Sequence, residues 1–176
     1  MKLKIRQEEP RDFKAVFDLI EKAFRDVEYS DHTEQFLVER LRNSEAFIPE
    51  LSLVAAVDDQ IAGHILLTKI KVKNETQEFD SLALAPVSVL PESQGNGIGG
   101  KLILKAHKIA RELGYESVIL LGHAEYYPKF GYRQLDEFGI ILPFDVPKEN
   151  CMAVELTDGA LDEVNGVVVY AKEFFG

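Results

Sequence analysis

One stretch past the middle of the 176-residue chain decides the fold, and it reads VSVLPESQGNGIGG from Val87 to Gly100. The apolar residues predict a strand, Pro91 predicts a short turn after it, and the glycines then open a long amphipathic helix. The start of a helix leaves backbone N–H groups unpaired and carries partial positive charge. Because glycine lets the backbone approach a ligand closely, this segment is expected to bind a phosphate or pyrophosphate.

The glycines allow two other interpretations. They could form a turn that only connects the strand to the helix. Gly95, Gly97 and Gly100 also match the G-x-G-x-x-G pattern of dinucleotide-binding proteins, in which Glu125 would be the ribose-binding acid. That pattern should follow its strand at once, whereas residues 91–94 intervene here, so a nucleotide-binding oxidoreductase is the minor alternative.

On either side of this stretch, hydrophobic periodicity predicts a single mixed α/β domain over residues 1–176. We expect strands over residues 2–7, 51–57, 61–72, 78–90, 117–122, 152–156 and 166–170. We expect helices over residues 13–24, after Asp31 as N-cap, from the glycine stretch to about Leu113, and over residues 126–131. Pro86 removes one hydrogen bond from its strand and therefore belongs at a bulge or an edge.

Composition and charge exclude several classes of protein to which this chain could otherwise belong. Hydrophobic residues make up 46% of the chain, enough for a packed core, and no apolar run approaches the ~20 residues of a membrane helix. The first ten residues, MKLKIRQEEP, alternate like a strand and lack the apolar region of a signal peptide. A formal net charge of −10 disfavours nucleic acid as a partner. It also means that an anionic cofactor must be held by local, oriented donors.

Cysteine and histidine usage adds three expectations. Cys151 is the single cysteine, which excludes an internal disulfide and, with no signal sequence, favours the cytoplasm. We expect a spectator thiol, because no base lies beside it in the sequence. No metal site is expected, because the spacing of the histidines is not that of paired ligands: His32, His64, His107 and His123.

Several segments are similar to the GNAT acetyltransferase superfamily. Residues 94–99, QGNGIG, resemble its Q/R-x-x-G-x-G/A acetyl-CoA motif, and the preceding Leu90-Pro91-Glu92 is also typical. Residues 127–132, YPKFGY, resemble the family's Y-x-x-x-G-F/Y signature. The order of elements matches over nearly the whole chain. A YhbS-like bacterial subgroup is indicated by LGH at residues 121–123, YY at 126–127 and MAVEL at 152–156.

This resemblance implies a mixed, mostly antiparallel sheet with a splayed central strand pair, flanked by helices, and acetyl-CoA as cosubstrate. Val87, Ser88 and Val89 would pair their backbone with the pantetheine arm, as an added strand does. Tyr127 would be the general acid that protonates the departing thiolate, and its alternative role is packing beside the cleft. The remaining implied cofactor-binding residues are Gln94, Gly95, Asn96, Gly97, Ile98, Gly99 and Gly100.

The general base stays unassigned. Many family members carry a carboxylate on or near the central strands, but residues 82–89 contain none. His123 follows an apolar strand and is a candidate, although it could also be an exposed loop histidine. His64 is interpreted as structural, and Tyr126 as a packed or substrate-facing neighbour of the acid. The candidates for the base are Glu28, Asp31, Glu34 and His123.

The predicted activity is acetyl transfer from acetyl-CoA to a primary amine of a small molecule or peptide. In this family the loop at residues 25–32 normally walls the acceptor pocket, and its carboxylates would suit a cationic amine or form a solvated surface. Tyr29 could stack on the substrate or fill the core. Phe174 and Phe175 could form a homodimer contact or a packed tail. The second hypothesis is an acyl-CoA-binding domain without turnover.

Overall fold

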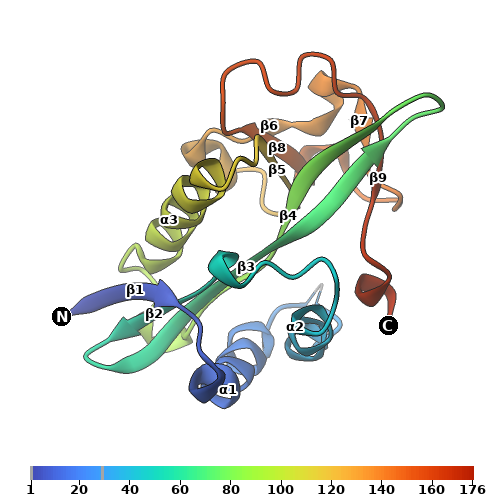
Figure 1. Ribbon diagram of the computed structural model, residues 1–176. Coiled ribbons are helices and arrows are strands. Elements are labelled where there is room, and N and C mark those ends of the chain that lie inside the picture. Colours follow the sequence, from blue (N-terminus) through green and yellow to red (C-terminus); the bar gives the residue numbers. More distant parts are fainter. Residues whose placement is uncertain (1, 29) are drawn as a thin grey trace.

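The computed structural model describes residues 2–28 and 30–176 and shows one mixed β-sheet with helices on both faces (Figure 1). Its strands are β1 (Leu3–Gln7), β2 (Ser52–Val57), β3 (Gln60–Lys73), β4 (Glu78–Val89), β5 (Ser117–Leu121), β6 (Arg133–Gln134), β7 (Ile140–Ile141), β8 (Cys151–Glu155) and β9 (Gly166–Val169). Its α-helices are α1 (Phe13–Phe24), α2 (Glu34–Arg42) and α3 (Ile98–Glu112). Short 3-10 helices span Pro10–Asp12, Pro49–Leu51, Pro91–Ser93, Tyr127–Phe130, Leu135–Phe138, Lys148–Asn150 and Lys172–Phe175.

The strand order confirms the expected fold class. The sheet runs β1-β2-β3-β4-β5-β8-β6, and β9 pairs with the far end of β3 and with β7. Strands β1 to β4 are antiparallel, α3 makes the crossover to the parallel neighbour β5, and β8 returns antiparallel to β5. A dinucleotide-binding fold needs successive parallel β–α–β units, so this mostly antiparallel sheet does not fit the oxidoreductase alternative.

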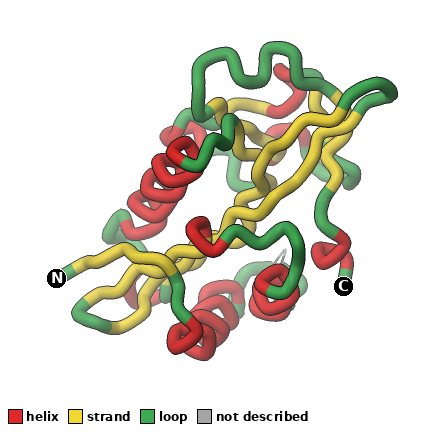
Figure 2. Tube along the Cα trace, in the orientation of Figure 1, coloured by secondary structure: helices red, strands yellow, loops and turns green. Residues whose placement is uncertain are grey.

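The helices cover opposite faces of the sheet because successive side chains of a strand point to opposite sides (Figure 2). On β3, Leu66 packs in one cluster with Val16 of α1 and Leu41 of α2. Its neighbour Ile65 packs in another cluster with Leu102 of α3. Burying each such side chain stabilises the fold by roughly 1.5–3 kcal/mol. No helix among the described residues is long and apolar enough to cross a membrane.

The start of α2 differs from the expectation. The N-cap is Thr33, and Asp31 precedes it in a turn. The Asp31 carboxylate accepts hydrogen bonds from the Thr33 backbone N–H at 3.0 Å and from the Thr33 hydroxyl at 2.7 Å. The prediction of Asp31 as N-cap was therefore wrong, because this carboxylate is used in the turn two residues before the actual N-cap, Thr33.

The expected bulge at Pro86 is present. The register between β3 and β4 shifts so that Ile65 lies opposite Val87 while Leu67 lies opposite Leu84. Two residues of β4 therefore stand opposite one residue of β3, which is the definition of a bulge. Proline fits there because the extra residue leaves the ladder and needs no partner for a backbone N–H.

Strands β4 and β5 separate next to this bulge. Their ladder consists of Leu82 opposite Val118 and Ala83 opposite Ile119. Beyond that point β4 continues along β3 to Val89, whereas β5 continues along β8. The described ladders thus confirm the splayed strand pair, and the last part of β4 has one edge that no strand of the described sheet occupies.

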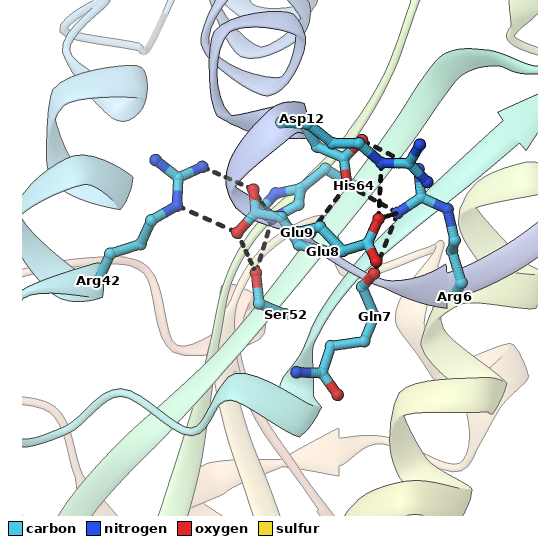
Figure 3. A network of polar contacts seen from close by, with 9 residues as sticks. Arg6, Gln7, Glu8, Glu9, Asp12, Arg42, Ser52 and His64 are labelled. Atoms are coloured by element: carbon cyan, nitrogen blue, oxygen red, sulfur yellow. Dashed lines mark hydrogen bonds and ion pairs between the residues drawn. The ribbon is translucent and has the colours of Figure 1, made fainter.

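A buried polar network fastens the start of the chain to the sheet (Figure 3). Arg42 of α2 donates to Glu8 with two hydrogen bonds of 3.0 and 2.6 Å, and Ser52 donates to the same carboxylate at 2.9 Å. The Nε2 atom of His64 lies 3.1 Å from the Ser52 hydroxyl. Desolvation lowers the pKa of His64 to about 4, against an opposing effect of Glu8. His64 is fully buried in this network, which confirms its structural interpretation.

Candidate functional site

The free edge of β4 exposes backbone groups at two of the three residues assigned to the pantetheine arm. Leu90 donates its N–H to Ala62 on the β3 side at 2.9 Å. Because antiparallel backbone groups alternate in direction, Ser88 also points toward β3, while Val87 and Val89 point toward the side that β5 has left. This edge could therefore pair with an extended ligand.

The side chains of this segment alternate in the opposite sense. Val87 and Val89 pack toward the core under α3. Ser88 is buried on the other face, and its hydroxyl has no hydrogen-bond partner among the described residues. Any ligand on the free edge would thus contact backbone atoms of β4 more than side-chain polar atoms.

The glycine stretch forms the expected helix start. Gly97 is the N-cap of α3 and is left-handed, with φ of 75°, and Gly95 has φ of 85°. The first backbone bond of the helix runs from the Lys101 N–H to the Gly97 carbonyl at 3.1 Å. The N–H groups of Ile98, Gly99 and Gly100 precede that bond, so they form the open positive end of the helix.

Two polar side chains hold this loop in shape. The Gln94 side-chain amide donates to the Val89 carbonyl at 3.2 Å, and the Asn96 amide donates to the Ser93 carbonyl at 3.1 Å. Gln94 thereby links the glycine loop to the end of β4. These bonds indicate that Gln94 and Asn96 contribute to a ligand site by shaping its backbone.

The second predicted motif packs directly on the first. The Tyr126 hydroxyl lies 3.1 Å from the position that a Cβ atom on Gly99 would take, and a Val89 methyl lies 3.7 Å from the same point. The Phe130 ring lies 3.1 Å from the corresponding position on Gly100. A side chain larger than glycine at either position would push these aromatic residues away from the helix start by a few tenths of an ångström.

Tyr127 begins the 3-10 helix η4 (Tyr127–Phe130) and is 8% exposed. Its ring packs edge-on against Tyr126 at a centroid distance of 5.1 Å and against Tyr132 at 5.7 Å. It also lies against the backbone of Gly122, which follows β5. The predicted acid thus lies where β5 ends. Its neighbour Tyr126 contacts the glycine cradle, which is the glycine stretch of residues 95–100 at the start of α3.

A buried pair supports Tyr127 from behind. The hydroxyl of Tyr132 and the Nε2 atom of His107 are 2.8 Å apart. Burial raises the pKa of Tyr132 well above its ordinary value and lowers the pKa of His107 to about 4. The phenol therefore donates to a neutral imidazole near pH 7, which fixes the orientation of Tyr132 against Tyr127.

Local contacts already engage several of the candidates for the general base. Asp31 is exposed and engaged with Thr33, and Glu34 accepts a hydrogen bond of 2.6 Å from Ser30 through one oxygen. His123 is exposed, and its backbone carbonyl accepts from Tyr126 at 3.2 Å. The prediction for Tyr29 lies outside the described residues.

The single cysteine agrees with its predicted role. Cys151 is buried at the start of β8, and desolvation raises its pKa, as suits a spectator thiol.

The structure gives Tyr126 a position that the sequence did not predict, because its hydroxyl lies beside Gly99 of the glycine cradle. The Tyr126-Tyr127 pair was the available signal, but two adjacent tyrosines give no indication of which ring faces which element.

Comparison with known proteins gives consistent results. A family model described as an acetyltransferase (GNAT) domain matches residues 4–135. The uncharacterised N-acetyltransferase YjhQ of Escherichia coli K12 is 38% identical over 115 residues, which are 65% of this chain and 64% of that protein. The uncharacterised N-acetyltransferase YhbS of the same strain is 28% identical over 171 residues, which are 97% of each chain.

Solved structures agree with this family. A GNAT family acetyltransferase from Brucella melitensis in complex with acetyl-CoA is 34% identical, with a TM-score of 0.81 and 98% of both chains covered. YhbS from Escherichia coli in complex with CoA is 24% identical, with a TM-score of 0.89, and covers 100% of this chain and 93% of its own. The likeness to YhbS, at 24% identity, shows the fold alone. The chain belongs to the GNAT family of acetyltransferases, in agreement with the resemblance of its two motifs.

Proposed function

We propose that this chain transfers the acetyl group of acetyl-CoA to a primary amine of a small-molecule or peptide acceptor. One observation carries the proposal: the Tyr126 hydroxyl lies beside Gly99 at the start of α3, and the Tyr126 ring packs edge-on against Tyr127. This arrangement supports the proposal because it places the predicted diphosphate-binding helix start, a methyl of Val89 at the end of β4 and the predicted acid around one tyrosine. The acetyl-CoA complex of the Brucella relative supports the choice of cosubstrate.

The cosubstrate would lie along β4 with its diphosphate at the start of α3. The backbone of Val87 and the N–H of Val89, whose carbonyl already accepts from Gln94, would pair with the amides of the pantetheine arm, as an added strand would. The N–H groups of Ile98, Gly99 and Gly100 would hold the diphosphate. These oriented donors act at short range, so they can bind an anion despite a formal net charge of −10.

The chemical step would be direct attack on the thioester. The neutral amine nitrogen forms a bond to the acetyl carbon, and the carbon–sulfur bond breaks as the tetrahedral intermediate collapses. The departing CoA thiolate takes a proton from the Tyr127 phenol, and the new amide nitrogen loses its extra proton to water. A thiol of pKa ~8.5 and a phenol of pKa ~10 differ modestly, so this transfer is feasible, and solvent can reprotonate the phenol.

The acceptor must be deprotonated before it attacks. For a lysine-like amine of pKa ~10.4, reaching the neutral form at pH 7 costs about 4.6 kcal/mol. The carboxylates Glu28, Asp31 and Glu34 in and after the α1–α2 loop would attract such a cation. They are also the candidates for a base or for a water relay, together with His123.

Binding and turnover can be tested separately. We expect calorimetric titration to detect micromolar binding of acetyl-CoA and none of NAD or NADP. An amine screen should then reveal acetyl transfer that Tyr127→Phe slows by 10²-fold or more, while Tyr115→Phe, in the connection between α3 and β5, serves as the matched control. Equal turnover by wild type and Tyr127→Phe would remove Tyr127 from the mechanism. Tight binding without any transfer would favour the acyl-CoA-binding domain that lacks turnover.

A further inference from the structure

Two side chains from one short segment border the glycine stretch at the start of α3, and a third side chain from this segment packs on one of them. Tyr126 lies with its hydroxyl beside Gly99, and Phe130 packs against Gly100. The ring of Phe130 also supports Tyr126 edge-on, at a centroid distance of 5.3 Å. The ammonium of Lys129 lies 4.4 Å from the centroid of the Tyr126 ring, which is cation–π distance. The segment thus places a cation on the ring whose hydroxyl lies beside the predicted diphosphate site.

This cation is available for a ligand. Lys129 is exposed and forms no ion pair with any described residue, whereas Lys14, Lys73 and Lys108 each pair with a carboxylate. The chain carries 30 acidic and 20 basic side chains. The distinguishing feature of Lys129 is its place on the Tyr126 ring, where its charge would counteract the repulsion that the net charge of the chain imposes on an anion.

We propose that Lys129, positioned by the Tyr126 ring, binds the diphosphate of acetyl-CoA opposite the backbone N–H groups of α3, and that it makes the protein select diphosphate-bearing thioesters over truncated ones. This inference rests on the proposed function and names a part of the same site that its motifs do not assign. The ammonium would donate charge-assisted hydrogen bonds to phosphate oxygens, which are stronger than bonds between neutral groups.

Tyr126 has two distinct tasks in this arrangement. Its ring holds the lysine ammonium, and its hydroxyl lies beside Gly99 in the first turn of α3, where the phosphates would bind. Burial raises the pKa of Tyr126, so the phenol keeps its proton and can donate a hydrogen bond. Replacing the hydroxyl and replacing the ring should consequently have different effects.

The test compares three ligands by calorimetry: CoA, dephospho-CoA, which keeps the diphosphate but lacks the 3′-phosphate, and pantetheine, which lacks both. We expect Lys129→Gln to weaken CoA and dephospho-CoA alike, by about fivefold to tenfold, and to leave pantetheine unchanged. Lys4→Gln on β1 removes the same charge from an exposed position and should leave all three affinities unchanged. Thermal unfolding would verify that both variants are folded.

Two variants of Tyr126 test whether its ring positions Lys129 against the diphosphate. Tyr126→Leu should weaken CoA nearly as much as Lys129→Gln, with little added loss in the double variant, because the ring and the ammonium act as one unit. Tyr126→Phe should weaken CoA binding less than Tyr126→Leu does, because the ring that holds the ammonium remains. Loss of CoA affinity without loss of dephospho-CoA affinity would assign Lys129 to the 3′-phosphate and overturn the proposal. An unchanged affinity of the Lys129→Gln variant for CoA would also overturn the proposal. Failure of the wild type to bind CoA would instead refute the proposed function itself.

Discussion

A Cβ atom on Gly122 would overlap the ring of Tyr127. The backbone of Gly122 cannot easily withdraw, because its N–H donates to the Asn150 carbonyl at 2.8 Å and its own carbonyl accepts from the Asn150 side chain at 2.9 Å. The end of β5 is thus fixed from the β8 side, and the tyrosine ring is fitted against it. The position of the proposed acid depends on the absence of one methyl group.

Gly122→Ala should therefore displace Tyr127 while leaving the glycine cradle intact. We expect kcat for acetyl transfer to fall by roughly 10²-fold, because a shift of about 1 Å in a reacting group has an effect of that size. The Kd of acetyl-CoA should change by less than about threefold, and calorimetry measures it independently of turnover.

The matched comparison is the double variant Gly122→Ala with Tyr127→Phe. If the alanine acts through the phenol, the double variant should be no slower than Tyr127→Phe alone. Additive losses would contradict the structural relationship and point to a general disturbance of the β5 end.

Ser88→Ala tests whether the cofactor pairs with the backbone of β4. The Ser88 hydroxyl is buried without a hydrogen-bond partner among the described residues, so its removal should leave stability unchanged or raise it by up to about 1 kcal/mol. The Kd of acetyl-CoA should stay the same. A large loss of affinity would show that the hydroxyl itself contacts the ligand.

Gly97→Ala should destabilise the protein by about 1–2 kcal/mol through backbone strain alone. Gly97 has φ of 75°, where a Cβ atom is disfavoured, yet no atom lies within 4 Å of the position that the new Cβ would take. Gly97→Asn should cost less, because asparagine tolerates the left-handed region better. Urea denaturation of the two variants would measure this difference, and an equal cost in both would argue for a steric cause.

His64 should make stability fall with acidification. Its folded pKa of about 4 lies below the ordinary value of 6.5, so the unfolded chain takes up the proton first as the pH drops. The free energy of unfolding is therefore highest above pH 6.5 as far as His64 is concerned. It falls by about 3 kcal/mol between pH 6.5 and 4 through this group. His107, also with a folded pKa of about 4, should add to the loss in the same window.

Chemical denaturation at pH 7.5 and at pH 5 would measure this loss. His64→Gln should lower stability at both pH values, because the buried Glu8–Arg42–Ser52 network is disturbed, but it should flatten the dependence on pH. An unchanged pH slope in that variant would show that His64 is not the responsible group.

Much of the fold could be predicted because the decisive signals are local. Alternation and periodicity located the longer strands and helices, whereas β6 and β7 have two residues each and leave no periodic pattern. The bulge was predictable because proline lacks a backbone donor wherever it stands. The turn at Asp31 was misjudged by two residues because a carboxylate next to a helix can bind either the helix end or the turn before it.

The sequence by itself determined the glycine cradle and the order of elements, since helix starts and strand alternation follow from neighbouring residues. Only the tertiary structure decided which tyrosine borders the cradle, what holds Tyr127, and what surrounds His64. Those relationships join positions far apart in the chain: Tyr126 to Gly99, Gly122 to Asn150, and Glu8 to Arg42 and His64. Such contacts arise only when the sheet brings separate elements together, and no short-range pattern of residues encodes their distance or direction.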